Sequence, residues 1–212
     1  MTHNTERYDR FTHKYNESDI NHVPLHRFEA VDGKSLNLQS IVKPDVWDDL
    51  QEVIATGKRR SDPQLTPGAV GCYLSHKNIW QYCHRTNVII FEDDADIPPY
   101  TYDQISTLLK QLHGKDWDIL LLGFVSNQRS STSMVRIKRF FCTHAYIVRD
   151  PQNLHKKVSN AIPRPAQQID SDLSDLSEKG IINVYGYGPG DLISQTYETP
   201  SDIQTPFFDK DN

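Results

Sequence analysis

Short apolar runs alternate with amphipathic stretches along this chain. Residues 88–91 and 117–123 are predicted to be strands buried on both faces, because uninterrupted apolar runs are typical of buried strands. Residues 140–148 and 183–185 are predicted as two further strands, and residues 26–31 as another that ends at a turn. The pattern therefore predicts a sheet whose central strands carry apolar side chains on both faces.

The stretches between these runs carry apolar residues at helical spacing. One helix is expected to begin with Thr66 as its N-cap and Pro67 at its first position. The early glycines Gly68 and Gly71 indicate close approach of a backbone or a ligand, or tight packing on a strand. Alternating strands and helices indicate an α/β sheet with parallel pairs. The predicted helices cover residues 6–15, 44–56, 66–83, 101–113, 168–178 and a stretch after Pro151.

Length and charge limit the possible functions. The chain has 212 residues, 37% of them hydrophobic, which suits one α/β domain. We expect a single domain over residues 1–203 and a frayed tail over residues 204–212. The net charge of −5 argues against a nucleic-acid binder with a broad basic surface, so no nucleic-acid partner is predicted. The short basic run at residues 58–60 reads as a solvated loop, with phosphate contact as the alternative.

The cysteines and the apolar runs bear on the compartment. Cys72, Cys83 and Cys142 show no metal-binding spacing, and an odd count without a signal peptide suits buried thiols in a reducing compartment. The longest apolar run, residues 119–125, is too short to span a bilayer, so no transmembrane segment is predicted. We therefore expect a cytoplasmic protein that reaches a membrane only peripherally.

Carboxylates gather directly after the strand predicted at residues 88–91. Glu92, Asp93, Asp94 and Asp96 follow it within five positions, at the strand end where α/β sheets bind ligands. Two unit charges about 4 Å apart repel by roughly 4 kcal/mol at an effective dielectric near 20, so a cation is expected among them. Hard oxygen ligands favour Mn²⁺ or Mg²⁺ over Zn²⁺. Nucleotide-sugar transfer, phosphoester hydrolysis and nucleotidyl transfer all fit such a cluster, and a solvated turn is the alternative.

Several segments resemble glycosyltransferase family 25, which includes lipopolysaccharide galactosyltransferases and collagen β-galactosyltransferases. The resemblance is strongest in RFEAVDG at residues 27–33, TPGAVGCYLSH at residues 66–76 and IFEDDA at residues 90–95. It extends over about residues 5–203. The weaker pieces that support it are residues 117–120, 143–148, 169–173, 189–195 and 201–203.

The resemblance implies a fold, a donor and a reaction. It implies a GT-A-type sheet flanked by helices, a nucleotide-sugar donor such as a UDP-hexose, a divalent metal and inversion at the anomeric carbon. A glycan, a lipopolysaccharide or a protein would be the acceptor. Family members begin with an apolar strand, whereas only residues 1–4 precede the first matching segment here, so the usual first strand is expected to be absent. A catalytically inactive relative that serves as a binding or scaffold module remains an alternative, as does a metal-dependent phosphoesterase.

The resemblance also assigns roles to the acidic triplet. Glu92, Asp93 and Asp94 match the family's metal- and diphosphate-binding motif. If the strand continues through them, alternation places Glu92 and Asp94 on one face, where they would share the cation. Asp93 would then face a ribose or a backbone amide.

Further site residues follow from the resemblance and from the chemistry of an inverting transfer. Such a transfer needs a carboxylate to take the proton of the acceptor hydroxyl. Asp170 is the first candidate for this base and Asp172 the second, although either could instead cap a helix or lie exposed. His76 could equally be a hydrogen-bonded histidine at the edge of the core. The residues expected near the donor are Ala30, Asp32, Gly33, Ser75, His76, Asp93 and Gln195.

Overall fold

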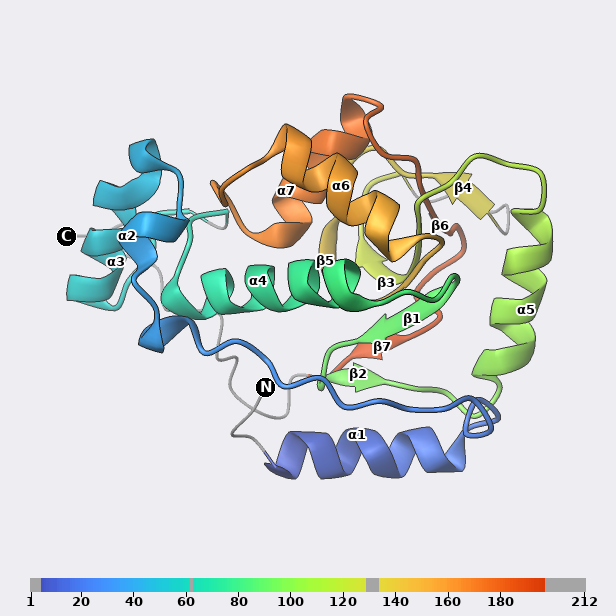
Figure 1. Ribbon diagram of the computed structural model, residues 1–212. Helices are drawn as coiled ribbons and strands as arrows, with labels where there is room; N and C mark the ends of the chain where they lie inside the picture. The colour runs from blue at the N-terminus through green and yellow to red at the C-terminus, as the bar shows by residue number, and fades with distance from the viewer. Residues whose placement is uncertain (1–4, 62, 129–133, 197–212) are drawn as a thin grey trace.

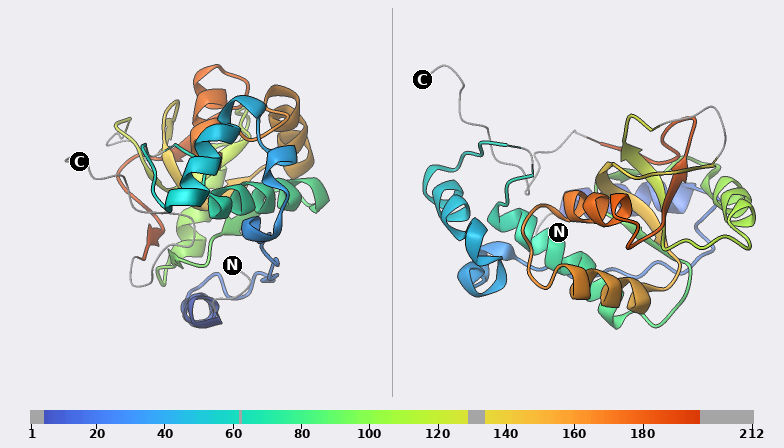
Figure 2. Two further views of the ribbon diagram at one scale, coloured as in Figure 1. Left: turned by 90° about the vertical axis from the view of Figure 1, so that its left-hand side faces the viewer. Right: turned by 90° about the horizontal axis from the view of Figure 1, so that it is seen from above.

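A mixed sheet with helices on both faces forms the centre of the molecule (Figures 1 and 2). The computed structural model describes residues 5–61, 63–128 and 134–196. The tail predicted at residues 204–212, the matching segment 201–203 and residues 1–4 lie outside the described parts. The expectation of an absent first strand therefore stays a prediction.

The main sheet contains five strands in the order β1-β5-β3-β6-β4. Because β1, β3 and β6 run in one direction, their carboxyl ends lie at the same edge. Among the described strands, β3 and β6 form a parallel pair, and every other neighbouring pair is antiparallel. The prediction of parallel pairing is thus confirmed for this pair alone. The strands are β1 (Val88–Phe91), β5 (Phe141–Val148), β3 (Ile119–Val125), β6 (Val184–Tyr187) and β4 (Met134–Arg136).

The two apolar runs that begin at residues 88 and 117 have different surroundings. In β3, Ile119 and Leu121 pack on one face while Leu120 and Leu122 pack on the other, so this strand is buried on both faces as predicted. In β1 only Ile90 is buried, and its neighbours are partly exposed. The prediction of a fully buried β1 is wrong because this strand lies at the edge of the sheet.

Helices cover both faces of the sheet. On one face, α4 (Pro67–Tyr82), α6 (Pro151–Ala161) and α7 (Ile169–Glu178) pack over β1, β3 and β5. On the other face lie α1 (Thr5–Glu17) and α5 (Thr101–Gln111), along the bottom and right of Figure 1. These helices match the predicted ones in position. None of the helices in the described residues is long and apolar enough to cross a membrane.

A small third cluster packs against the first half of α4, to the left in Figure 1. Pro44 opens the short 3₁₀ helix Pro44–Val46, which leads into α3 (Trp47–Thr56). Gly57 ends α3 with a φ of 68°, a left-handed conformation that glycine adopts without strain. The predicted helix over residues 44–56 is therefore confirmed with a tighter first turn, and α2 (Leu38–Ile41) was not foreseen.

The predicted strand at residues 26–31 is wrong. This segment pairs with none of the described strands, and at Val31 it lies against α4. The backbone N–H of Val31 donates to Ser75 Oγ at 2.8 Å, so α4 supplies the partner that a strand would have supplied. A Cβ on Gly71 would lie 2.4 Å from the carbonyl oxygen of Val31, which explains the glycine as a site of close backbone approach.

A second sheet of two short strands was also not foreseen. β2 (Ala95–Asp96) pairs antiparallel with β7 (Ser194–Gln195), far along the chain. The N–H of Thr196 donates to the Asp94 carbonyl at 2.9 Å, which extends the pairing. This pairing brings Gln195 next to the acidic triplet.

The basic run at residues 58–60 is not the solvated loop that was predicted. Arg59 is only 2% exposed, so its side chain lies inside the fold. Arg60 is exposed and pairs with Glu52 on α3 at 2.6 Å. The run is thus held against the helical cluster that includes α3.

Candidate functional site

A cavity of about 980 Å³ opens beside β1 and brings together most of the predicted site residues. α1 contributes Arg7, α4 contributes Ser75 and His76, and the first turn of α7 contributes Asp170. Asp32, Gly33 and Asp172 are not among the residues that line it. The predicted residues that do line it are Ala30, Ser75, His76, Glu92, Asp93, Asp94, Asp170 and Gln195.

The acidic triplet does not continue β1. The strand ends at Phe91, and the N–H of Ala95 donates to the Glu92 carbonyl at 3.2 Å, which closes a turn. In that turn Asp93 and Asp94 both contact one guanidinium, while Glu92 points to α4 and β5. The expected pairing of Glu92 with Asp94 on one face is therefore wrong, because alternation holds only within a strand.

Arg7 is the cation that Asp93 and Asp94 share. Its Nη2 lies 2.8 Å from Asp93 Oδ1 and 3.0 Å from Asp94 Oδ2, and its side chain is 6% exposed. Gln195 donates from Nε2 to Asp94 Oδ2 at 2.8 Å. Asp94 Oδ1 is buried and has no hydrogen-bond partner among the described residues. Burial and the Glu92 carboxylate raise the pKa of Asp94, and the contacts with Gln195 and Arg7 offset this only in part.

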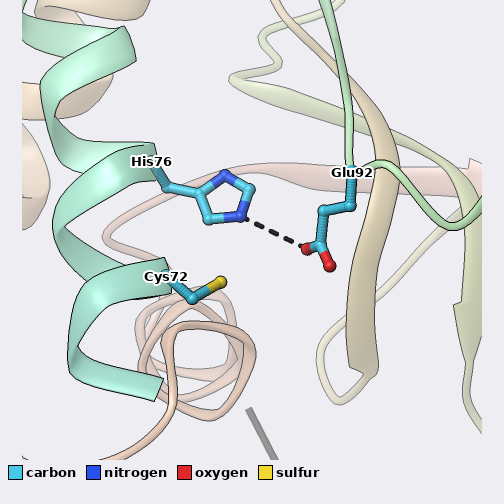
Figure 3. Close-up of side chains that lie close together, drawn as sticks. All are labelled: Cys72, His76 and Glu92. Carbon is cyan, nitrogen blue, oxygen red and sulfur yellow. Dashed lines mark hydrogen bonds and ion pairs between the residues drawn. The ribbon is translucent and has the colours of Figure 1, made fainter. Parts of the chain in front are cut away.

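Glu92 has a different environment. Thr143 Oγ1 donates to its Oε1 at 2.9 Å, and His76 Nε2 lies 3.3 Å from the same oxygen (Figure 3). Burial acts to raise the pKa of Glu92, but the hydrogen bonds from His76 and Thr143 and the charge of His76 outweigh it. The pKa of Glu92 is therefore lowered, and this carboxylate is ionised at neutral pH.

His76 is fixed by a buried chain of hydrogen bonds. Trp80 Nε1 donates to Tyr146 Oη at 3.0 Å, and that hydroxyl lies 2.7 Å from His76 Nδ1. In the neutral tautomer that donates from Nε2 to Glu92, Nδ1 accepts the tyrosine proton, whereas in the charged ring both nitrogens donate. The hydrogen bond expected for His76 at the edge of the core is therefore present, and the side chain also lines the cavity. Its contact with the donor stays a prediction.

Cys72 joins this group, an association that the spacing of the cysteines among themselves does not indicate. It precedes His76 by four residues on α4, so both side chains point to the same side (Figure 3). One ligand atom from each of Cys72, His76 and Glu92 lies within 4.8 Å of the others. Burial, together with the nearby carboxylates, raises the pKa of the Cys72 thiol.

Asp170 lies in the first turn of α7, with its carboxylate held from two sides. The backbone N–H groups of Cys142 and Ser171 donate to it at 2.8 Å and 2.7 Å. Cys142 has a φ of 70°, a strained conformation for a side chain other than glycine, and it points its N–H at Asp170. Burial raises the pKa of Asp170 despite these hydrogen bonds.

Asp172 is two residues further along α7 and lies away from the cavity. It is 2% exposed, and Gln167 Nε2 donates to its Oδ1 at 3.3 Å. Burial raises the pKa of Asp172 to about 6. Only Asp170 of the two candidate bases therefore lines the cavity.

Sequence comparison gives this arrangement a family. Residues 1–185 match the family described as Glycosyltransferase family 25 (LPS biosynthesis protein). The chain belongs to glycosyltransferase family 25. Its mixed sheet with helices on both faces is consistent with a GT-A-like fold, as the resemblance implied.

Named members of family 25 are similar to parts of this chain. Procollagen galactosyltransferase 1-A of Xenopus laevis is 31% identical over 132 residues, which make up 58% of this chain and 20% of that protein. A glycosyltransferase 25 family member of Anopheles gambiae is 29% identical over 127 residues, 55% of this chain and 20% of that protein. The inactive glycosyltransferase 25 family member 3 of Mus musculus is 32% identical over 103 residues, 45% of this chain and 16% of that protein. The match spans about one fifth of the first two curated relatives.

The family motif at residues 27–33 supports the backbone beside the cavity. Ala30 lines the cavity, and Ser75 holds the adjacent Val31 N–H. Asp32 Oδ1 caps the 3₁₀ helix Gly33–Ser35 by accepting from the Lys34 N–H at 3.0 Å. A Cβ on Gly33 would lie 1.7 Å from the Pro67 carbonyl oxygen, so no larger residue fits there. The donor contacts assigned to Asp32 and Gly33 stay predictions.

Sequence reasoning missed Arg7, Thr143 and the metal-binding potential of Cys72. Arg7, Phe11 and Tyr15 are spaced four residues apart and are all buried on α1, so a charged residue on an apolar stripe was the available signal. For Cys72 the signal was its spacing of four residues from His76 on a predicted helix. Thr143 carried no signal, because only the fold brings β5 beside the acidic turn.

Proposed function

We propose that this member of family 25 transfers a hexose, with galactose as the first choice, from a UDP-sugar to a glycan, lipopolysaccharide or protein acceptor, with inversion. The observation that carries the proposal is that the acidic turn and Asp170 line one cavity. The named galactosyltransferase among the relatives supports the choice of sugar. The cavity's volume of about 980 Å³ is at the upper end of the usual range for small-ligand sites.

The acidic turn fits a hard divalent ion, Mn²⁺ or Mg²⁺. Asp94 Oδ1 is buried without a partner among the described residues, and burial together with the Glu92 carboxylate raises the pKa of Asp94. Asp93 and Asp94 would hold the ion beside Arg7. Both hydrogen bonds to Glu92 end on Oε1, which leaves Oε2 for a ligand. When bound, the ion would offset the negative charge that grows on the departing diphosphate.

Asp170 is the base of this proposal. Its raised pKa makes it a stronger proton acceptor than a free aspartate, and two backbone N–H groups fix its direction. Asp170 accepts the proton of the acceptor hydroxyl as that oxygen bonds to the anomeric carbon. The nucleoside diphosphate leaves with the electron pair of the old bond, through an oxocarbenium-like state.

The compartment belongs to the proposal too. All three cysteines are free of disulfides, although Cys72 and Cys142 lie near one site. Free thiols favour a reducing compartment, so we place the protein in the cytoplasm, with peripheral access to membrane-bound acceptors.

The experiment measures UDP release from a panel of UDP-sugars, with collagen peptides and lipopolysaccharide core oligosaccharides as acceptors. Asp170→Asn should lower kcat by about 10²- to 10⁴-fold and leave the KM for the donor nearly unchanged, because only proton transfer is lost. Asp172→Asn is the matched control on the same helix turn and should keep its kcat. Full turnover by Asp170→Asn would remove Asp170 as the base. Loss of turnover in Asp172→Asn alone would assign the role of the base to Asp172.

A second candidate function is a binding module without turnover. The mouse relative that is named inactive favours it, as does Arg7, which already forms ion pairs with Asp93 and Asp94. Under this alternative, UDP and Mn²⁺ would raise the Tm together, but no donor in the panel would release UDP faster than in buffer.

A further inference from the structure

Three side chains with different ligand chemistry meet at the inner wall of the cavity. Cys72 and His76 come from successive turns of α4, and Glu92 faces them from the end of β1 (Figure 3). One thiol, one imidazole and one carboxylate atom lie within 4.8 Å of one another. All three residues also line the cavity.

The spacing suits a tetrahedral ion. Two ligand atoms about 2.0 to 2.1 Å from one ion, at a tetrahedral angle, lie about 3.3 Å apart. His76 Nε2 and Glu92 Oε1 are 3.3 Å apart, which is longer than the usual N–H···O distance of about 2.9 to 3.0 Å. A Zn–S distance near 2.3 Å would place the Cys72 sulfur about 3.6 Å from the other two ligand atoms, and the three atoms lie within 4.8 Å of one another before any ion is bound.

Surrounding groups already orient the ligands. When Nε2 of a neutral histidine binds an ion, Nδ1 carries the proton and donates it, and here Tyr146 Oη, 2.7 Å from His76 Nδ1, would accept that hydrogen bond. Trp80 fixes that hydroxyl in turn, and Thr143 donates to Glu92 at 2.9 Å. These partners are buried and come from β5 and α4, so the set is held from two elements of the core.

The mixture of ligands selects the ion. Thiolate and imidazole favour Zn²⁺, whereas Mn²⁺ and Mg²⁺ prefer sites made of oxygen alone. One thiolate, one carboxylate and one neutral imidazole balance the two charges of Zn²⁺, so the filled site would carry no net charge inside the protein. We propose that Cys72, His76 and Glu92 bind Zn²⁺ or another thiophilic divalent ion, with a fourth position open to the cavity.

Binding has a consequence for the neighbouring turn. The Cys72 proton leaves to solvent when the thiolate binds, so occupancy rises with pH. The ion would tie α4 to the end of β1 and fix Glu92, while Asp93 and Asp94 remain for the donor site. The proposal does not depend on glycosyl transfer, because it concerns binding alone.

Co²⁺ titration of the chelator-treated protein tests the site, because a thiolate ligand gives Co²⁺ a charge-transfer absorption. We expect one equivalent of Co²⁺ with this absorption and with the visible bands of tetrahedral coordination. One equivalent of Zn²⁺ should displace it, and a large excess of Mg²⁺ should not. Cys72→Ser should abolish the charge-transfer band, and His76→Gln should weaken binding at least tenfold. Cys83→Ser, at the end of the same helix, is the matched control and should bind like the wild type.

Three results would overturn the proposal. The first is that wild-type protein gives no thiolate band with Co²⁺, a test that needs no variant. The second is that the band survives in Cys72→Ser or disappears in Cys83→Ser. The third is that Zn²⁺ raises the Tm of folded His76→Gln as much as that of wild type. If Cys72→Ser does not fold, the wild-type titration and the His76→Gln variant still test the proposed metal site.

Discussion

Glu92 and Asp94 are two residues apart in one turn, yet their environments are opposite. Glu92 accepts from Thr143 and contacts His76, and its pKa is lowered. Asp94 contacts Arg7 and Gln195, and its pKa is nevertheless raised. Both side chains are largely buried, with 19% and 13% exposed. Burial therefore does not decide the outcome. What decides it is whether the hydrogen bonds and charges around the carboxylate outweigh the loss of water.

The difference suggests a division of labour within the acidic turn. Glu92 is connected through His76 and Tyr146 to the core, so it is held in place. Asp94 keeps one buried oxygen without a partner among the described residues and depends on a cation from α1. The first arrangement suits a fixed support, and the second suits the binding of an additional cation.

Removing the guanidinium of Arg7 should have the largest effect on the stability of the fold. Arg7→Met leaves Asp93 and Asp94 buried without their guanidinium, and we expect a loss of about 3 to 5 kcal/mol of unfolding free energy. Urea unfolding measures it. Lys14→Met, on the same helix, breaks only an exposed pair with Asp96 at 3.6 Å and should cost less than about 1 kcal/mol. Equal losses in both variants would contradict the prediction that the buried ion pairs of Arg7 stabilise the fold more than the exposed pair of Lys14.

Asp172 extends the comparison to a buried carboxylate that accepts a hydrogen bond from Gln167 and interacts electrostatically with Lys77. Its pKa of about 6 lies above an unfolded value near 3.9, so ionisation costs the folded state about 3 kcal/mol at pH 8. The folded pKa is raised, so wild-type stability rises as the pH falls through it. Asp172→Asn should be more stable than wild type at pH 8, and the gain should vanish near pH 4. A gain that is the same at both pH values would contradict the raised pKa.

Disrupting the hydrogen bonds that support His76 and Glu92 should cost less unfolding free energy. Tyr146→Phe removes the hydroxyl that contacts His76 Nδ1 and Trp80 Nε1, and leaves buried polar atoms without a partner. We expect a loss of about 1 to 3 kcal/mol by thermal or urea unfolding. Tyr82→Phe is the control on α4, where the side chain is 67% exposed and the change should be within about 0.5 kcal/mol. No difference between the two variants would mean that the hydroxyl does not hold His76.

The smallest expected effect is a change in the pH dependence of stability when Glu92 or Asp94 in the acidic turn is replaced by its amide. Glu92 stabilises the folded state above its unfolded pKa near 4.3 and loses this as the pH falls through its lowered folded pKa. Asp94 has a raised folded pKa, so the folded state gains stability as the pH falls through it. Stability should therefore fall less steeply in acid for Glu92→Gln and more steeply for Asp94→Asn than for wild type. Each contributes about 1.4 kcal/mol per unit of pKa difference. If the slope of stability against pH changed in the same direction in both variants, the opposite pKa shifts of Glu92 and Asp94 would be contradicted.

Local pattern predicted most elements and the place of the acidic turn. The strand 88–91, the cap at Thr66 and the helix stop at Gly57 depend on residues that are close in sequence, and all three are confirmed. The segment at residues 26–31 was misread because Ser75, more than forty residues away, supplies its partner. Such a long-range hydrogen bond leaves no trace in the periodicity of the chain.

The candidate site shows the same limit. The carboxylates were recognised because they follow one another in sequence, and Asp170 and Gln195 were placed by family resemblance. Thr143 and Tyr146 reach the site from β5, so only the fold reveals them, whereas the position of Arg7 on the apolar stripe of α1 was a signal in the sequence. Alternation through Glu92 and Asp94 failed because Phe91 ends the strand.

The most direct measurement is calorimetric titration of UDP into the protein with and without Mn²⁺. We predict that UDP binds, that Mn²⁺ strengthens the binding, and that Asp94→Asn loses at least tenfold in affinity, or about 1.4 kcal/mol. Gly114, in the turn after α5, carries no ligand role, so Gly114→Asn serves as a remote control with unchanged affinity. No heat from UDP under either condition, or equal affinity in Asp94→Asn, would contradict a donor site at the acidic turn.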